Sequence, residues 1–214
     1  MTPHERRQRL ARSFLYLCTA LRDDLDTFLD DVLRGGVDVV QLRDKTAAVD
    51  ALRTAAAVFR RACDGHDALF VVNDDPHLAL EVGADGVHVG QDDPTPAEVR
   101  DVVGAELLIG RSTHTIEQID RAQTEPCDYF AVGPVHATPT KQGRPGIGLA
   151  PLRHAAAVGC KPWFVTGGMS TDTAGPVLDA GGRRLVVVRA LTQADDPYTV
   201  ARGLREGLNT SRPA

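Results

Sequence analysis

Short apolar segments alternate with amphipathic segments along most of the chain. The apolar segments are rich in valine, leucine and aromatic residues and are hydrophobic almost without interruption. Such segments are typical of parallel strands that are buried on both faces of a sheet. The pattern predicts strands at Phe14–Thr19, Val37–Arg43, Leu69–Asn73, Gly86–Val89, Leu107–Arg111, Tyr129–Val132, Trp163–Thr166 and Leu185–Val188.

The intervening segments have apolar residues at the spacing of an α-helix, in which positions i, i+3, i+4 and i+7 lie on one side. One apolar face runs through Leu25–Leu33, a second through Val49–Cys63 and a narrower third through Val200–Leu208. Two sequences predict helix N-termini. Thr95–Glu98 has the pattern of a capping box with proline at the first helical position, and Thr115–Gln118 has a second capping pattern.

Eight alternations of strand and helix predict an α/β fold, a (β/α)8 TIM barrel with an additional N-terminal helix near residues 3–12. No proline- or glycine-rich linker divides the chain, so residues 1–214 are expected to form a single domain with a core of about residues 14–208. A doubly wound open sheet is the main structural alternative. The count of eight favours the barrel, in which the active site lies at the carboxyl ends of the strands.

Composition and charge narrow the function classes. Hydrophobic residues make up 43% of the chain, and the formal net charge is −5 without a basic run. Intrinsic disorder and general nucleic-acid binding are therefore disfavoured. The four cysteines have no metal-ligand spacing and are expected to be reduced. Because no segment has the character of an export signal or a membrane span, we expect a cytoplasmic protein with small-molecule partners.

Polar residues are concentrated where the predicted strands end. Strand two ends in Gln41–Lys45, and alternation puts the first and third of these residues on one face. Strand three ends in Asn73–Asp75, and strand four leads to Gln91–Asp93. Carboxylates on neighbouring strands can share one Mg²⁺, which prefers a few carboxylates together with water and substrate phosphate. The sequence therefore predicts a Mg²⁺ site near the ends of these two strands.

Several of these residues also have simpler interpretations. Asp75 precedes a proline, and Asp92 and Asp93 lie just before another, so each can cap a helix. His88 and His114 are either acid–base groups or packed, hydrogen-bonded residues near the barrel rim. No Ser-His-Asp order and no metal-type histidine spacing singles them out.

The later strand ends have residues suited to phosphate. Strand five ends in Gly110–Thr115, which includes a serine that can donate to phosphate or form a local turn. Strand six leads into Gly133–Gly143, a loop of hydroxyls, glycines and Lys141, one of only three lysines in the chain. Paired glycines, Gly167–Gly168, follow strand seven, where barrels commonly bind phosphate at backbone N–H groups.

The strand ends together predict two anion sites. One comprises Arg43, Lys45, Asn73, Ser112 and Lys141, with Asp74 and Asp93 nearby for a metal. The other comprises Thr138, Thr140, Gly168 and the end of strand eight. A metal with several cations suits a diphosphate, whereas backbone amides and hydroxyls suit a monophosphate. This combination predicts an enzyme that joins a diphosphate substrate to a monophosphate substrate and releases diphosphate.

The same motifs resemble those of the thiamine-phosphate synthase (thiamine-phosphate pyrophosphorylase) family. The resemblance spans about residues 14–205, and the motifs occur in the family's order. It is carried by Gln41–Lys45, Asn73-Asp74, Gly86–Asp93, Gly110–His114, Gly133–Lys141 and Gly167–Gly168.

The resemblance implies a (β/α)8 fold and a Mg²⁺-dependent transferase reaction. The substrates would be 4-amino-5-hydroxymethyl-2-methylpyrimidine diphosphate and 4-methyl-5-(2-phosphoethyl)thiazole or its carboxylated form. The products would be thiamine phosphate and diphosphate. In the family mechanism, diphosphate leaves the pyrimidine methylene and the thiazole nitrogen attacks the resulting cation, so no protein nucleophile is required.

The resemblance also implies residue roles. Asp74 and Asp93 would bind Mg²⁺, and Asp93 is chosen over Asp92 because the family's ligand is the second residue of the acidic pair. The catalytic groups would be Arg43, Lys45, Ser112 and Lys141. The pyrimidine diphosphate would be held by Gln41, Leu42, Arg43, Asp44, Lys45, Asn73, Ser112 and Lys141, and the thiazole phosphate by Thr138, Pro139, Thr140, Gly168, Val188 and Arg189.

Arg189 departs from the family pattern, in which many members have a small residue such as serine. Its guanidinium either contacts the thiazole phosphate or points outward. Two other functions stay open: a thiazole tautomerase, which would not need the diphosphate and metal residues, and a non-catalytic regulator that binds thiazole phosphate or thiamine phosphate. A sugar-phosphate isomerase would need a placed Glu/His pair, which the chain lacks. Self-association is left open.

Overall fold

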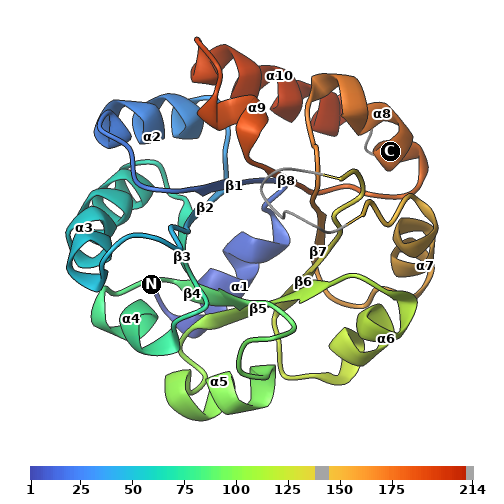
Figure 1. Cartoon of the computed structure of the whole chain (residues 1–214), viewed down its shortest axis with the longest axis horizontal. Coiled ribbons are helices and arrows are strands. Elements are labelled where there is room, and N and C mark those ends of the chain that lie inside the picture. Colours follow the sequence, from blue (N-terminus) through green and yellow to red (C-terminus); the bar gives the residue numbers. More distant parts are fainter. Residues whose placement is uncertain (138–144, 211–214) are drawn as a thin grey trace.

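A computed structural model describes residues 1–137 and 145–210 of the chain. Eight parallel strands form a closed barrel, and helices surround it (Figure 1). The strands are β1 Leu15–Thr19, β2 Val39–Leu42, β3 Leu69–Asn73, β4 Gly86–Val89, β5 Leu108–Thr113, β6 Tyr129–Val132, β7 Trp163–Val165 and β8 Leu185–Val187. The helices are α1 Pro3–Ala11, α2 Leu25–Arg34, α3 Val49–Gly65, α4 Pro76–Glu81, α5 Pro96–Val103, α6 Ile116–Thr124, α7 Ala150–Val158, α8 Thr171–Asp179, α9 Arg189–Thr192 and α10 Pro197–Thr210.

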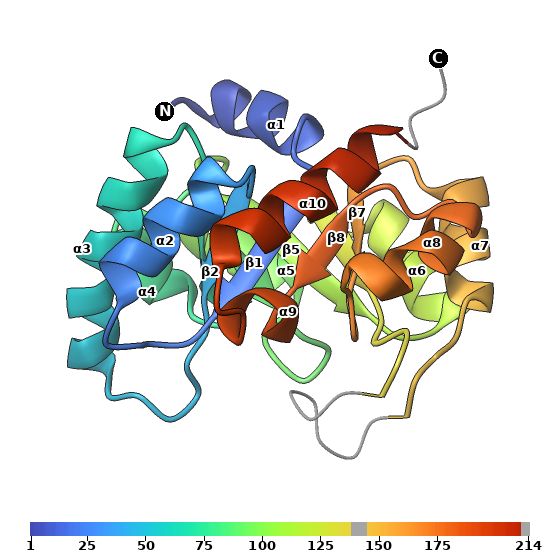
Figure 2. The same ribbon diagram turned by 90° about the horizontal axis from the view of Figure 1, so that it is seen from above.

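The first strand closes the sheet by pairing with both the second and the last. Tyr16 lies opposite Val39 of β2 and opposite Val186 of β8. Because no strand edge is left open, the prediction of a (β/α)8 barrel is confirmed and the open-sheet alternative is wrong. The additional N-terminal helix is also confirmed as α1, which lies across one end of the barrel, while α9 lies toward the other end (Figure 2).

Strand alternation divides the buried residues into two cores. Inside the barrel, Val39 and Val71 pack with Phe164 and other inward-facing residues. Leu10 of α1 joins this inner core, so the helix closes the amino-terminal end of the barrel. The outward-facing residues of the strands, such as Val40, pack against the helices in a larger outer core. Inward residues near the carboxyl ends of the strands are consequently the ones that can face a ligand.

A few local predictions differ from the structure. β5 continues two residues beyond its predicted end, because Ser112 and Thr113 pair with β6. Val49 begins α3 but is exposed, so it is wrongly placed on the apolar face of that helix. The capping box at Thr95 is confirmed. At the second site, Thr115 caps α6, but the Gln118 side chain accepts from the backbone N–H of His114 rather than completing a box.

Three aspartates bind backbone N–H groups at the amino-terminal end of the barrel. Asp38, Asp85 and Asp128 directly precede β2, β4 and β6, respectively. The carboxylate of Asp38 accepts from the N–H of Leu15 at 3.0 Å, that of Asp85 from Phe70 at 2.9 Å and that of Asp128 from Ile109 at 2.9 Å. Each carboxylate thus links the start of its own strand to the preceding odd-numbered strand.

Arginines neutralise these three carboxylates. Asp85, which is 1% exposed, accepts from Arg6 of α1 at 3.1 Å and from Arg60 of α3 at 2.8 Å. Asp128 is paired in the same way with Arg7 and Arg100, and Asp38 is paired with Arg205. These ion pairs connect helices to the strand starts and hold α1 against the amino-terminal end of the barrel.

Within the described ranges 1–137 and 145–210, no helix has the length and apolar character needed to cross a membrane.

Replacing Asp85 with alanine is expected to reduce the free energy of unfolding by about 3–5 kcal/mol, because two partly buried guanidinium groups and a buried N–H lose their acceptor. Glu206→Ala provides the control: Glu206 forms an ion pair with Arg202 whose side chains are 66% and 60% exposed, and its loss should change stability by less than about 0.5 kcal/mol. Urea unfolding of both variants would measure the difference. Equal effects would contradict a structural role for Asp85.

Candidate functional site

A cavity of about 580 Å³ opens at the carboxyl ends of the strands. It is lined by residues that lie on, or directly after, all eight strands. The sequence-predicted residues on its wall are Gln41, Arg43, Asn73, Ser112, Gly168, Val188 and Arg189. The barrel therefore brings into one cavity groups that are separated by almost 150 positions in the chain, as the barrel prediction required.

The segment Gln41–Lys45 shows how alternation sorts the predicted residues. Gln41 and Arg43 line the cavity, as predicted from their shared face. Leu42 points outward into the outer core. The carboxylate of Asp44 accepts from the N–H groups of Thr46 at 3.0 Å and Ala47 at 3.1 Å, so its side chain shapes the following turn. Leu42 can therefore contact a ligand in the cavity only through its backbone, whereas the Asp44 carboxylate mainly holds the turn.

The floor of the cavity contains a chain of hydrogen bonds that the sequence prediction missed. The Cys18 thiol donates to Gln41 Oε1 at 3.1 Å, and Gln41 Nε2 donates to the Tyr16 hydroxyl at 2.8 Å. Tyr16 lies 3.1 Å from the Tyr129 hydroxyl. The only sequence signal for these hydrogen bonds is that tyrosine, cysteine and glutamine occupy inward positions of strands that are otherwise apolar.

The series of hydrogen bonds continues from Tyr129 on β6 to residues of β4 and β5. The Tyr129 hydroxyl lies 3.2 Å from His88 Nδ1, and His88 Nε2 lies 2.9 Å from Ser112 Oγ. His88 is therefore a hydrogen-bonded residue of the cavity wall, which agrees with the simpler of its two interpretations. Burial raises the pKa of Tyr16 and of Tyr129.

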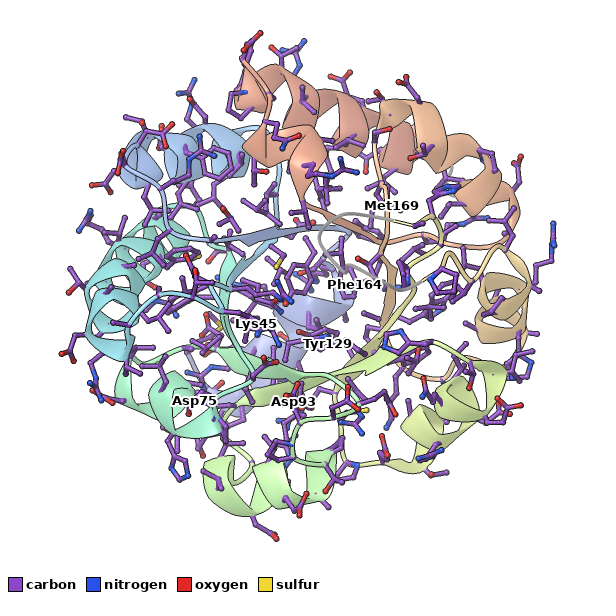
Figure 3. All side chains as sticks on the ribbon, viewed as in Figure 1. Lys45, Asp75, Asp93, Tyr129, Phe164 and Met169 are labelled. Atoms are coloured by element: carbon purple, nitrogen blue, oxygen red, sulfur yellow. The ribbon has the colours of Figure 1, made fainter. Side chains whose placement is uncertain are left out.

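Asp74 and Asp93 lie next to one another on the neighbouring loops after β3 and β4. Lys45 Nζ lies 2.9 Å from Asp74 Oδ2. Asp74 has a φ of +64°, a left-handed conformation that is uncommon outside glycine. In Figure 3, which looks down the barrel, Lys45 and Asp93 lie on the β2–β5 side, whereas Met169 lies on the opposite side.

The two carboxylates affect one another's ionisation. Burial raises the pKa of Asp74, and its proximity to Asp93 adds to this effect although Lys45 opposes it. For Asp93, burial acts against ionisation, but a 2.7 Å hydrogen bond from Gly90 N–H, together with neighbouring groups, lowers its pKa. Two adjacent carboxylates that resist simultaneous ionisation are typical of a cation site.

This acidic pair fits a hard divalent cation. Both ligands supply oxygen, and two carboxylates leave most of the octahedral positions of Mg²⁺ for water and substrate phosphate. In the part of the chain that the structure describes, no group of three or more His, Cys, Asp or Glu residues is placed to enclose a metal. The pair therefore suits a metal that is held jointly with a substrate rather than a closed structural site.

The neighbouring aspartates differ in role. Asp75 accepts from the N–H groups of His77 and Leu78, both at 2.9 Å, and thereby caps α4. The capping interpretation of Asp75 is confirmed. Asp93 is the member of the Asp92-Asp93 pair that contacts Asp74.

Arg111 supports the loop that carries Asp93, a role that the sequence prediction missed. Its side chain is 4% exposed, and Nη1 donates to the carbonyl oxygen of Gly90 at 2.5 Å. Gln91 Nε2 donates to the carbonyl oxygen of Ser112. Both bonds tie the loop after β4 to β5. Because the N–H of Gly90 binds the Asp93 carboxylate, this attachment also fixes the position of Asp93.

The opposite side of the cavity is formed by backbone. Gly167 and Gly168 have φ values of +103° and +72°. Their carbonyl oxygens accept from His136 N–H and from Thr173 Oγ1, respectively. Among the described residues, their own N–H groups have no protein partner, so they can receive an anion. Thr138, Pro139, Thr140 and Lys141 lie outside the described residues.

Known proteins match most of the chain. The family model of thiamine monophosphate synthase matches residues 15–191. The chain belongs to this family. A thiamine-phosphate synthase of Thermobifida fusca is 48% identical over 94% of this chain and 95% of its own length. Another, from Saccharopolyspora erythraea, is 46% identical over 94% of this chain and 96% of its own length.

Solved structures extend the comparison. A thiamine phosphate pyrophosphorylase from Pyrococcus furiosus has a TM-score of 0.86 and 28% identity, and the match covers 97% of this chain and 99% of that one. A 3-hexulose-6-phosphate synthase from Salmonella typhimurium, at 19% identity and a TM-score of 0.70, shares the fold. As a thiamine monophosphate synthase family member with such relatives, the chain is a transferase that functions in thiamine-phosphate synthesis.

The glycine turn of this synthase-family barrel predicts a position that tolerates no side chain. A Cβ at Gly167 would lie 2.5 Å from Pro134 Cα and Val135 N, at a φ that L-residues rarely adopt. Gly167→Ala is therefore expected to lower the melting temperature and the rate of thiamine-phosphate formation. Gly207→Ala in α10 is the matched control, because nothing lies within 4 Å of its Cβ and no proline follows it in the helix. It should be neutral or stabilise by up to about 1 kcal/mol. Wild-type melting and activity in Gly167→Ala would contradict the prediction.

Proposed function

We propose that the cavity joins 4-amino-5-hydroxymethyl-2-methylpyrimidine diphosphate to 4-methyl-5-(2-phosphoethyl)thiazole, or to its carboxylated form. The bond between the pyrimidine methylene carbon and the diphosphate oxygen breaks, and a bond forms between that carbon and the thiazole nitrogen. Thiamine phosphate and diphosphate are the products. The observation that supports this proposal is the presence of two dissimilar anion sites on opposite sides of one cavity.

The diphosphate belongs on the β2–β5 side. Arg43, Asn73 and Ser112 line the cavity there and can donate to phosphate oxygens. Gln41 lies deeper, beside Tyr16, where it can contact the pyrimidine ring. Lys45 and Lys141 complete the proposed set of cations. A departing diphosphate gains negative charge, so these groups stabilise the transition state more than the ground state.

Asp74 and Asp93 would hold Mg²⁺ at the edge of this diphosphate site. When bound, the ion neutralises charge on the diphosphate and makes it a better leaving group. Lys45 contacts Asp74 directly, so the ammonium group and the metal site share one carboxylate. Arg111 and the Gly90 peptide keep Asp93 beside its partner.

The thiazole phosphate belongs on the opposite side. The N–H groups of Gly167 and Gly168 and the backbone at Val188 and Arg189 can bind it, with Thr138, Pro139 and Thr140 contributing from the loop after β6. The Arg189 side chain lines the cavity and is exposed at its mouth, so its guanidinium can reach an anion. The phosphate held here would position the thiazole ring for attack, which lowers the entropic cost of the reaction.

The reaction needs no protein nucleophile. Loss of diphosphate leaves a cation that the aminopyrimidine ring stabilises, and the thiazole nitrogen supplies the electron pair for the new bond. Such a reaction requires groups that bind the diphosphate and the pyrimidine ring, and the cavity offers Arg43, Asn73 and Ser112 for the diphosphate and Gln41 for the ring. The proposal includes a cytoplasmic location and small-molecule partners, and self-association stays open.

The test of the proposed function is an assay of purified protein with both substrates, with and without Mg²⁺, that detects thiamine phosphate. Product that requires both substrates and Mg²⁺ would support the proposal. Folded protein that forms no product, but isomerises a carboxythiazole phosphate, would instead favour the tautomerase.

The metal assignment predicts that Asp74→Asn and Asp93→Asn each lower kcat/KM by about 100-fold or more, the scale of losing one preorganised electrostatic group. Both should also weaken Mn²⁺ binding, used as a spectroscopic substitute for Mg²⁺. Asp75→Asn is the control, because Asp75 caps α4 and asparagine can also cap. Wild-type metal affinity in both variants would contradict the assignment.

The two anion sites predict different kinetic effects for their arginines. Arg43→Met should mainly raise KM for the pyrimidine diphosphate and lower kcat, because its guanidinium lies on the diphosphate side. Arg189→Ser should raise KM for the thiazole phosphate about tenfold and leave KM for the pyrimidine diphosphate unchanged. Steady-state kinetics with each substrate varied in turn would measure both. The reverse pattern would contradict the proposed orientation.

A further inference from the structure

In the series of hydrogen bonds in the cavity floor, the group at one end can determine which partner donates in the bonds that follow. A hydroxyl both donates and accepts, and a neutral imidazole has one donor nitrogen and one acceptor nitrogen. Each link from Gln41 through Tyr16, Tyr129 and His88 to Ser112 is 2.8–3.2 Å long. In a neutral His88, the role of one ring nitrogen fixes the role of the other, and through it the direction of the two tyrosine hydroxyls.

A diphosphate at Ser112 fixes that role. Ionised phosphate oxygens only accept hydrogen bonds, so the Ser112 hydroxyl must donate its proton to the substrate. The serine oxygen can then accept from His88 Nε2, which lies 2.9 Å away. If His88 is neutral and protonated on Nε2, its Nδ1 is an acceptor and needs a donor. The Tyr129 hydroxyl, at 3.2 Å, is that donor.

The other end of the chain agrees with this direction. Tyr129 donates to His88, so its oxygen accepts from Tyr16. The Tyr16 oxygen in turn accepts from Gln41 Nε2, which is the orientation of the amide in the structure, and Gln41 Oε1 accepts from Cys18. Each contact in this series then has one donor and one acceptor when Ser112 donates into the cavity.

Two further features suit Tyr129 to the donor role. Burial raises the pKa of both tyrosines, so each keeps its proton at neutral pH. In addition, β5 has glycine at the inward position beside this contact. A Cβ at Gly110 would lie 2.4 Å from His88 Nδ1 and 2.5 Å from the Tyr129 hydroxyl oxygen, so a side chain there would separate the two.

We propose that Tyr129 is a positioning residue: its hydroxyl donates to His88 Nδ1, so that His88 Nε2 donates to Ser112 and thereby orients the Ser112 hydroxyl toward the diphosphate. Tyr129 has no contact with substrate in this scheme and acts through its two neighbours. The inference rests on the proposed function for the role of Ser112, whereas the protonation pattern of His88 can be measured in the protein without turnover.

Nitrogen-15 NMR of the histidine side chains tests the pattern directly, with the His88 signals assigned from His88→Asn. The wild type should show His88 protonated on Nε2 and unprotonated on Nδ1. Tyr129→Phe, which removes one hydroxyl, should give a mixture of tautomers. Tyr16→Phe is the matched control, because Tyr129 can still donate to His88, and the wild-type pattern should persist. An imidazolium or an Nδ1-protonated ring in the wild type would overturn the proposal.

Kinetics supply a second test. Tyr129→Phe should lower kcat/KM about tenfold, and Tyr16→Phe about threefold or less, the range expected for single buried hydrogen bonds. In a Ser112→Ala background, Tyr129→Phe should have almost no further effect, because the serine through which it acts is gone. A full tenfold loss in that background would show that Tyr129 acts by another route.

A pair of variants at His88 keeps the proposal testable if Tyr129→Phe fails to fold. A glutamine amide nitrogen can occupy a position near Nε2 and donate to Ser112, whereas the shorter asparagine reaches only the Nδ1 position. His88→Gln should therefore retain several times more activity than His88→Asn at similar melting temperatures. Equal activities would overturn the proposal. Lack of turnover in the wild type with the expected His88 spectrum would instead count against the proposed function alone.

Discussion

The alternation of side chains in a closed parallel sheet is the constraint on which the rest of the structure depends. Each strand sends every second residue inward, and the barrel leaves no edge where this rule could be relaxed. Val39 therefore packs in the inner core, and Gln41, two residues later, lines the cavity. Leu42 is excluded from that cavity by the same rule. Contact with a ligand is therefore limited to inward positions toward the carboxyl end of each strand and to the loop that follows.

The sequence predicted much of this arrangement because apolar runs and polar strand ends are local signals. The barrel, the N-terminal helix and the placement of Arg43, Asn73 and Ser112 on one cavity all follow from such signals. The interior tyrosines could not be recognised in this way. In the sequence alone, a tyrosine within a buried strand is indistinguishable from an ordinary core residue. Only the register of β1 against its neighbours places the Tyr16 hydroxyl beside that of Tyr129.

Arg111 illustrates a second limit of sequence interpretation. It lies between Gly110 and Ser112, both of which face the interior, so its own side chain points outward and appears unrelated to the cavity. Its contact is with a backbone carbonyl of another loop. Contacts of a side chain with distant backbone leave no pattern in residue type or spacing, so neither periodicity nor motif can identify them.

The carboxylates of Asp38, Asp85 and Asp128 concentrate much of the polar cross-linking at the end of the barrel away from the cavity. The ion pairs at that end hold the strand starts, the surrounding helices and α1 together independently of the loops around the cavity. Loops at the mouth can then change length and composition without opening the sheet. One consequence is evolutionary, since a barrel anchored in this way can acquire new substrates by altering the unanchored end while its folding determinants stay untouched.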